Sequence, residues 1–298
     1  MSARLTLRAA LKSYPHTVGI KNGEITDPRV SLDCPDIEPI YKAFAPMAQR
    51  QEYDVSEMAF VTYLQAKAYG KPLVMLPTVV AARLQQGCIV YNAKRGPMTV
   101  ADLPGARVGV RAYSQTTGMW VRGILAETYG VALEQVNWVA FEHSHLLEYT
   151  DPPFATRAAA DKKMLDMLVA GELDAAIFGN DLPSGDGIVP LIPNAALADQ
   201  QWYARHQFVP PNHVVVMRRD VAEQHPDAVR AVYELLRRGK QAAPPSSPPN
   251  RLPTGIEAMR APLALTLDFC HQQQLLPRRL EAEEIFADSI EFLEESGN

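Results

Sequence analysis

The sequence has few cysteines and no long basic or apolar run. Its three cysteines, Cys34, Cys88 and Cys270, are odd in number and lack metal-ligand spacing, which favours reduced thiols over a disulfide framework. No stretch of 18 apolar residues predicts a membrane span, and no cluster of Lys and Arg predicts binding to nucleic acid. The net charge is −5. We therefore expect a small-molecule ligand.

The sequence also lacks two motifs that would suggest another location or function. Its first 20 residues contain no uninterrupted apolar segment followed by a small-residue cleavage site, so we expect a cytoplasmic protein. No glycine-rich dinucleotide fingerprint is present. With 298 residues, 47% of them hydrophobic, the chain can bury two moderate cores, and we expect two lobes. The sequence is compatible with a monomer or a homo-oligomer.

The clearest local pattern covers residues 102–125 (DLPGARVGVRAYSQTTGMWVRGIL), which predict a turn, a strand and a helix. Ser114, Thr116 and Thr117 lie where the helix should begin. Backbone N–H groups and the helix dipole favour an anion there, although the hydroxyls could equally serve only as caps. Trp120, one turn later, could stack on an aromatic ligand or pack in the core.

Polar residues also follow three other expected strands. Open α/β sheets bind ligands at the carboxyl ends of their parallel strands, so these residues are candidates for the same site. They are Ser56 and Glu57 in residues 53–58, His143 and His145 after residues 136–141, and Asn180 and Asp181 after residues 173–178.

The order of the expected elements predicts that the chain crosses twice between its lobes. We place the first crossing at residues 95–98, where Gly96 and Pro97 interrupt the pattern, and the return near residue 208. Residues 1–97 and 207–298 would then form lobe I, with a helical tail, and residues 98–206 would form lobe II. Two crossing strands would join the lobes, with a ligand cleft between them.

Several segments resemble the 4,5-dihydroxyphthalate decarboxylase family, and together they span most of residues 50–295. They are YDVSEMAFVTYL, PLVMLPTVVAARL, the segment at residues 102–125, LVAGELDAAIF, NHVVVMRRDVAEQHPDAV and the tail from residue 255 to residue 286. The resemblance implies a two-lobed α/β fold like that of type II periplasmic binding proteins. It also implies non-oxidative decarboxylation of a hydroxylated aromatic acid in phthalate catabolism, without an organic cofactor. The sequence departs from the family at residues 142–154, which leaves the substrate open.

The implied reaction replaces CO2 by a proton on an aromatic ring. It needs a general acid near the ring carbon and cationic groups for any carboxylate that remains. His213 suits the acid step, or it could be a packed, hydrogen-bonded histidine. Arg83 could bind a carboxylate through two N–H groups, or it could be a surface residue of a short helix. Glu57 could accept the phenol proton, orient His213, or cap the helix that follows it.

A metal and a different function both remain open. His143 and His145 alternate in an extended segment and, with Glu57 or His213, could bind a divalent metal; alternatively they are solvated. The main alternative function is a substrate-binding protein or sensor for a small aromatic carboxylate, and a third class is a biosynthetic enzyme on the same fold. A decarboxylase should release CO2, whereas a binding protein should leave its ligand intact.

Overall fold

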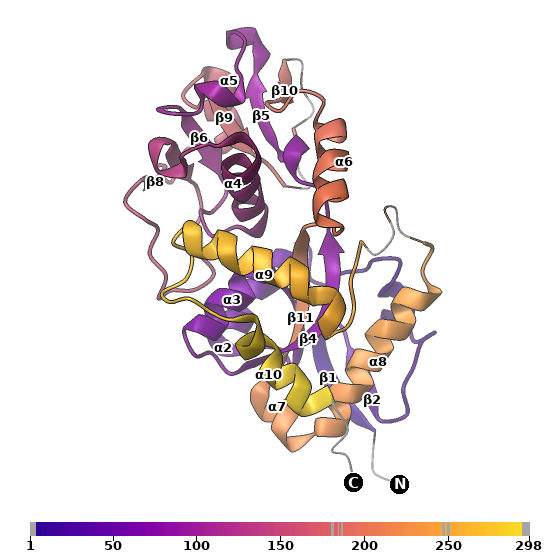
Figure 1. Ribbon diagram of the computed structural model, residues 1–298. Helices are drawn as coiled ribbons and strands as arrows, with labels where there is room; N and C mark the ends of the chain where they lie inside the picture. Colours follow the sequence, from indigo (N-terminus) through magenta and orange to yellow (C-terminus); the bar gives the residue numbers. More distant parts are fainter. Residues whose placement is uncertain are drawn as a thin grey trace. The chain divides into compact units, whose positions relative to one another are not determined.

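The computed structural model describes residues 4–179, 182, 183, 185, 187–245, 248 and 251–293 (Figure 1). The expected site residues Asn180 and Asp181 lie outside the described residues. The chain divides into two compact units. Unit 1 contains Met1–Ala82, Pro211–Leu267 and Pro277–Asn298, and unit 2 contains Arg83–Pro210 and Asp268–Leu276. None of the described helices is both long and apolar enough to span a membrane.

Within its described residues, unit 1 has a five-stranded sheet of order β2-β1-β3-β11-β4. β1 is parallel to β2 and β3, whereas β11 is antiparallel to β3 and β4. The carboxyl ends of β1 and β3 therefore lie at the same edge of the sheet as the beginning of β11. The strands are β1 (Leu5–Ala10), β2 (Val30–Asp33), β3 (Val55–Ala59), β4 (Leu73–Ala82) and β11 (Pro211–Arg218).

Helices cover both faces of this sheet. α2 and α3 pack against β3, while α8 and α10 pack on each other and on β4. α7 ends at Gln224 and α8 begins at Pro226, because proline fits the first turn of a helix better than its interior. The helices are α1 (Val18–Lys21), η1 (Ile40–Ala43), α2 (Phe44–Arg50), α3 (Phe60–Ala68), α7 (Arg219–Gln224), α8 (Pro226–Ala242), α9 (Ile256–Gln272) and α10 (Ala282–Leu293).

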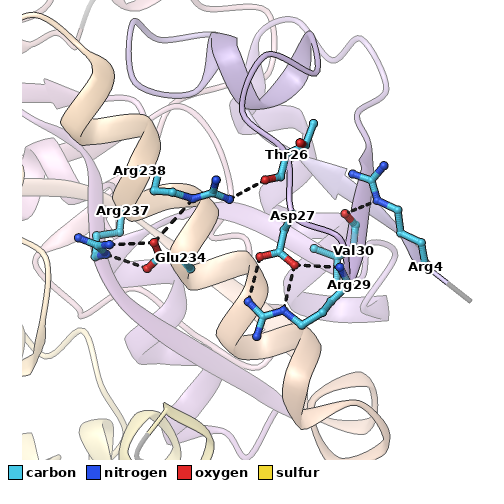
Figure 2. Close-up of polar contacts among 8 residues, drawn as sticks. All are labelled: Arg4, Thr26, Asp27, Arg29, Val30, Glu234, Arg237 and Arg238. Carbon is cyan, nitrogen blue, oxygen red and sulfur yellow. Dashed lines mark hydrogen bonds and ion pairs between the residues drawn. The ribbon is translucent and has the colours of Figure 1, made fainter. Parts of the chain in front are cut away.

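A group of arginines ties α8 to the connection between β1 and β2, as Figure 2 shows. Arg238 donates to the main-chain oxygen of Thr26 at 2.7 Å, and Glu234 accepts from Arg237 at 2.7 and 2.8 Å. Asp27 accepts from both Nε and Nη2 of Arg29, and these hydrogen bonds lower the pKa of the Asp27 carboxyl. These contacts give the arginines in this cluster a structural role.

Unit 2 has a six-stranded sheet within its described residues, of order β10-β5-β9-β6-β7-β8. Its first parallel strand and helix match the prediction for residues 107–125 closely. The strands are β5 (Ile89–Asn92), β6 (Arg107–Val110), β7 (Asn137–Ala140), β8 (Ala155–Arg157), β9 (Ala175–Ile177) and β10 (Ile188–Pro190). The helices are η2 (Gln86–Cys88), η3 (Ala93–Arg95), η4 (Val100–Asp102), α4 (Thr116–Tyr129), η5 (Leu133–Gln135), α5 (Met164–Ala170) and α6 (Ala195–His206).

The units divide the chain at a different place from the predicted crossing at residues 95–98. The boundary lies between Ala82 and Arg83, and β5 belongs to unit 2 because it pairs with β9 and β10. The return falls at Pro210 and Pro211, near the predicted residue 208. A short segment of the tail, Asp268–Leu276, also belongs to unit 2, although we assigned the whole tail to lobe I.

Candidate functional site

Glu57 and His213 form a hydrogen-bonded pair in unit 1. Glu57 lies in β3 opposite Val215 of β11, and His213 lies two residues before Val215. Because alternate residues of a strand face the same side, Glu57 and His213 project from one face as diagonal neighbours. His213 Nδ1 lies 2.6 Å from Glu57 Oε1. The pair therefore lies near the edge where β1 and β3 end.

The Glu57 carboxylate is completely buried and receives two further hydrogen bonds. Tyr14 Oη donates to Oε1 at 2.8 Å, and the main-chain N–H of Lys12 donates to Oε2 at 3.1 Å. Burial alone would raise the pKa of Glu57, but the bonds from His213, Tyr14 and Lys12 outweigh it, so the pKa is lowered. Glu57 is therefore an ionised acceptor with fixed orientation. It does not cap α3, which begins three residues later at Phe60.

The geometry of His213 leaves one imidazole nitrogen on the side away from Glu57. A carboxylate acceptor at Nδ1 favours a proton on that nitrogen, in the neutral or in the charged ring. Nε2 is then the nitrogen that can donate or accept a proton. The side chain is 21% exposed, and the ring of Phe44 packs edge-on against it at 5.1 Å. A carboxylate that holds one nitrogen of a partly exposed imidazole is an arrangement suited to general acid–base chemistry.

Tyr14 and His16 belong to this site, although we did not predict them. Their rings stack in parallel with centroids 5.0 Å apart, and both follow the carboxyl end of β1. The signal was present in the sequence, since residues 12–17 (KSYPHT) form a polar run directly after residues 5–11 (LTLRAAL), whose alternation is typical of a strand. We applied the strand-end rule to three other strands and not to this one.

The second predicted cluster lies at the start of α4 in unit 2. Arg83 Nη2 donates to Thr117 Oγ1 at 2.6 Å, which brings together two of the predicted substrate-binding residues. Arg83 lies in the irregular connection after β4 and not on a short helix. The N-cap residue is Gln115, whose side chain makes no capping hydrogen bond. Neither Ser114 nor Thr116 is therefore the N-cap residue of α4.

Two predicted substrate-binding residues have structural roles instead. Trp120 is fully buried, and the rings of Trp202, Phe208 and Phe269 pack edge-on against it within 6.3 Å. Ser56 is also fully buried, and its hydroxyl donates to the main-chain oxygen of Glu57 at 2.7 Å. We therefore assign both side chains to the packing and hydrogen bonding of the protein interior.

His143 and His145 lie in the irregular segment after β7, where His143 is exposed and His145 is half-buried. Among the residues that the structure describes, no group of three or more His, Cys, Asp or Glu side chains is arranged to hold a metal ion. The described residues therefore contain no such set of ligands for the divalent metal that we considered from the sequence.

Comparison with known proteins supports the resemblance noted from the sequence. The chain is 27% identical over 258 residues to a 4,5-dihydroxyphthalate decarboxylase from Comamonas testosteroni, covering 81% of this chain and 76% of that protein. It is 29% identical over 186 residues to a protein of the same name from Pseudomonas putida, covering 58% and 70%. No family model matches the chain.

Solved structures with the same fold include both binding proteins and an enzyme. The periplasmic aliphatic sulphonate binding protein SsuA from Escherichia coli matches with a TM-score of 0.58 at 13% identity, covering 94% of this chain and 96% of that one. The desulfurization enzyme DSZB matches with a TM-score of 0.56 at 13% identity, covering 97% and 99%. The chain therefore has the α/β fold of periplasmic binding proteins and resembles 4,5-dihydroxyphthalate decarboxylases over most of its length.

Proposed function

We propose that the chain is a non-oxidative decarboxylase of a hydroxylated aromatic acid such as 4,5-dihydroxyphthalate. The observation that carries the proposal is the pair of a buried, ionised Glu57 and a partly exposed His213. A protein that only binds a ligand has no need for a buried carboxylate aligned on an imidazole. The two relatives named 4,5-dihydroxyphthalate decarboxylase support the same reaction.

In this proposal His213 is the general acid. The protonated imidazole donates its Nε2 proton to the ring carbon that carries the departing carboxylate, and the para hydroxyl supplies electron density to that carbon. The bond to the carboxylate then breaks, its electron pair restores the aromatic ring, and CO2 leaves. The neutral imidazole is reprotonated from water. Glu57 acts as a positioning residue that stabilises the imidazolium, because both its oxygens already accept hydrogen bonds inside the protein.

In unit 2, a second group of residues is suited to binding a carboxylate. Arg83 offers a guanidinium suited to a carboxylate, and the beginning of α4 beside Thr117 adds the positive end of a helix dipole. Ser114 and Thr116 belong to the same turn. Loss of one carboxylate from 4,5-dihydroxyphthalate would leave a dihydroxybenzoate as the product.

The test is incubation of the purified protein with 4,5-dihydroxyphthalate, with CO2 and the aromatic product followed by mass spectrometry. The assay is run with a chelator and with added divalent metals. We expect His213→Gln to lower the rate by about 10²–10⁴-fold, the usual contribution of a general acid. The matched control is His271→Gln, because His271 is exposed, and it should keep the wild-type rate. Absence of CO2 under every condition would exclude the proposal.

The second candidate is a binding protein for a small aromatic carboxylate. It is favoured by the structural similarity to sulfonate-binding proteins. This candidate predicts that the ligand raises the thermal midpoint by mass action and is recovered unchanged. Stabilisation by 4,5-dihydroxyphthalate without any CO2 would therefore favour it over the decarboxylase.

A further inference from the structure

Arg122 is a fully buried cation that, among the described residues, makes its hydrogen bonds to neutral acceptors. It lies in α4 with an exposed fraction of 0%. Its Nε donates to Gln273 Oε1 at 2.8 Å, and its Nη2 donates to the main-chain oxygen of Tyr113 at 2.5 Å. Within the described part of the chain, its Nη1 is buried and has no hydrogen-bond partner. All the acceptors that this guanidinium contacts are neutral.

Two aromatic rings and one acidic side chain offset this charge only in part. The guanidinium lies 4.0 Å from the centroid of the Tyr113 ring and 5.4 Å from that of Trp138. Asp151 also interacts with it, but that carboxylate is paired with Arg157 at 2.9 Å. Arginine remains protonated in proteins, so the interior of unit 2 holds a positive charge that is only partly compensated, which is costly for stability. A feature of such cost needs an explanation.

The guanidinium lies directly behind the first turn of α4. A Cβ atom at Gly118, in that turn, would come within 3.1 Å of Arg122 Nη1 and 2.8 Å of Val110 Cγ2, so glycine is what lets the guanidinium approach. The side chains of Tyr113 and Gln115, which precede the helix, each contribute another buried polar atom without a hydrogen-bond partner among the described residues. Arg122, Tyr113 and Gln115, all in or just before α4, thus each have a buried polar atom without a hydrogen-bond partner among the described residues, and such atoms are rare in folded proteins.

We propose that the first turn of α4 binds a carboxylate of the substrate and that Arg122 is the buried charge that gives this turn its affinity for anions. The helix dipole and the guanidinium act in the same direction there, because both place positive potential at the turn. A doubly charged aromatic acid is then preferred over a singly charged one. The identity of the anion as a substrate carboxylate rests on the proposed function. The preference of this turn for a negative charge follows from the contacts of Arg122.

The experiment measures binding of phthalate, benzoate and benzamide to the full chain by titration calorimetry. These probes have the same ring, carry two, one and no negative charges, and lack the hydroxyl groups that decarboxylation needs. We expect phthalate to bind more tightly than benzoate, and benzamide not to bind. Arg122→Met should weaken phthalate binding by about tenfold or more, and Arg122→Lys should restore most of it. Without ligand, Arg122→Met should unfold at the same or a higher urea concentration, because a buried charge that is only partly compensated is removed.

A control variant tests whether Arg122 acts through its charge or through the hydrogen bonds that hold it in place. Gln273→Leu removes the acceptor of Arg122 Nε and a bond to the main-chain oxygen of Met119, yet it keeps the guanidinium. It should lower the urea midpoint and leave phthalate affinity within about threefold of wild type. If Arg122→Met instead destabilises the protein and binds phthalate as well as wild type, Arg122 only stabilises the fold and the proposal fails. It also fails if wild type binds neither acid. Charge-dependent binding without CO2 release from 4,5-dihydroxyphthalate would overturn the proposed function alone.

Discussion

His16 is a buried imidazole next to the Glu57–His213 pair. Its exposed fraction is 7%, its ring donates to the main-chain oxygen of Val80, and its Nε2 is buried without a hydrogen-bond partner among the described residues. Burial and, to a smaller extent, the positive charge of Lys240 lower the pKa of His16 from 6.5 to about 4. The folded state thus keeps this ring neutral at pH values where the unfolded chain protonates it.

The first prediction concerns the pH dependence of stability. Between pH 6.5 and about pH 4 the unfolded state binds a proton at His16 and the folded state does not, so stability falls as the pH is lowered. The contribution is at most about 3 kcal/mol across this range. Urea unfolding at several pH values should show that His16→Gln loses stability less steeply than wild type. His271→Gln, at an exposed position, should keep the wild-type slope. Equal slopes for wild type and His16→Gln would contradict the burial of a neutral imidazole.

At the residue scale, the sequence predicted the residue types of the site better than their contacts. Glu57 and His213 were identified from strand patterns and from the family resemblance, and the structure places them in contact. Tyr14 and His16 were missed although their polar connection follows a strand, because the sequence does not show that β1 pairs with β3, which brings Tyr14 to Glu57. Trp120 was ambiguous, since its spacing fits a ligand contact and a core position equally well.

The α4 helix contains two glycines at interior positions, where glycine costs about 1 kcal/mol relative to alanine. Gly118 makes room for Arg122. A Cβ atom at Gly123 would lie 2.0 Å from Cδ2 of Phe269, so Gly123 makes room for an aromatic ring. The two glycines therefore lower the intrinsic stability of the helix but allow Arg122 and Phe269 to pack closely against it.

This packing predicts that Gly123→Ala destabilises the protein although alanine is the better helix former. Overpacking against Phe269 should cost about 1–3 kcal/mol and exceed the gain in helix propensity. In a Phe269→Leu background, the same substitution should become neutral or stabilising, which a double-mutant cycle by urea unfolding would measure. Gly130→Ala serves as the contrast, because Gly130 has φ 68° and open space around it. Its cost of about 1 kcal/mol should be the same in both backgrounds.

At the scale of elements, the strands were predicted well and the boundary between the units was not. β4 runs through Pro77 to Ala82. It is an edge strand, and its register with β11 shifts between Leu76 and Val79, both of which are settings in which a strand tolerates proline. β5 then appeared to continue lobe I. Pairing partners decide which sheet a strand joins, and a single sequence does not reveal them.

At the scale of the whole molecule, unit 2 is assembled from two separate pieces of chain. Most of it is continuous from Arg83 to Pro210, and the rest is Asp268–Leu276. The short segment is well buried, with exposed fractions of 3% for Phe269 and 0% for Leu275. It also supplies Gln273, which binds Arg122. The continuous part alone therefore lacks a piece of its core.

A fragment of residues 83–210 should accordingly be less stable than the same fragment with residues 268–276 attached. A flexible glycine–serine linker of about 20 residues would let the segment reach its place without fixing its path. Burial of Phe269 and Leu275 should contribute about 1.5–3 kcal/mol each, less the entropy of closing the linker, so the joined fragment should gain at least about 2 kcal/mol in urea unfolding. A joined fragment with Phe269→Ser and Leu275→Ser controls for the linker and should behave like residues 83–210 alone. Equal stability of all three fragments would mean that the segment adds nothing to the core of unit 2. The packing of Phe269 would then not explain why residue 123 is a glycine.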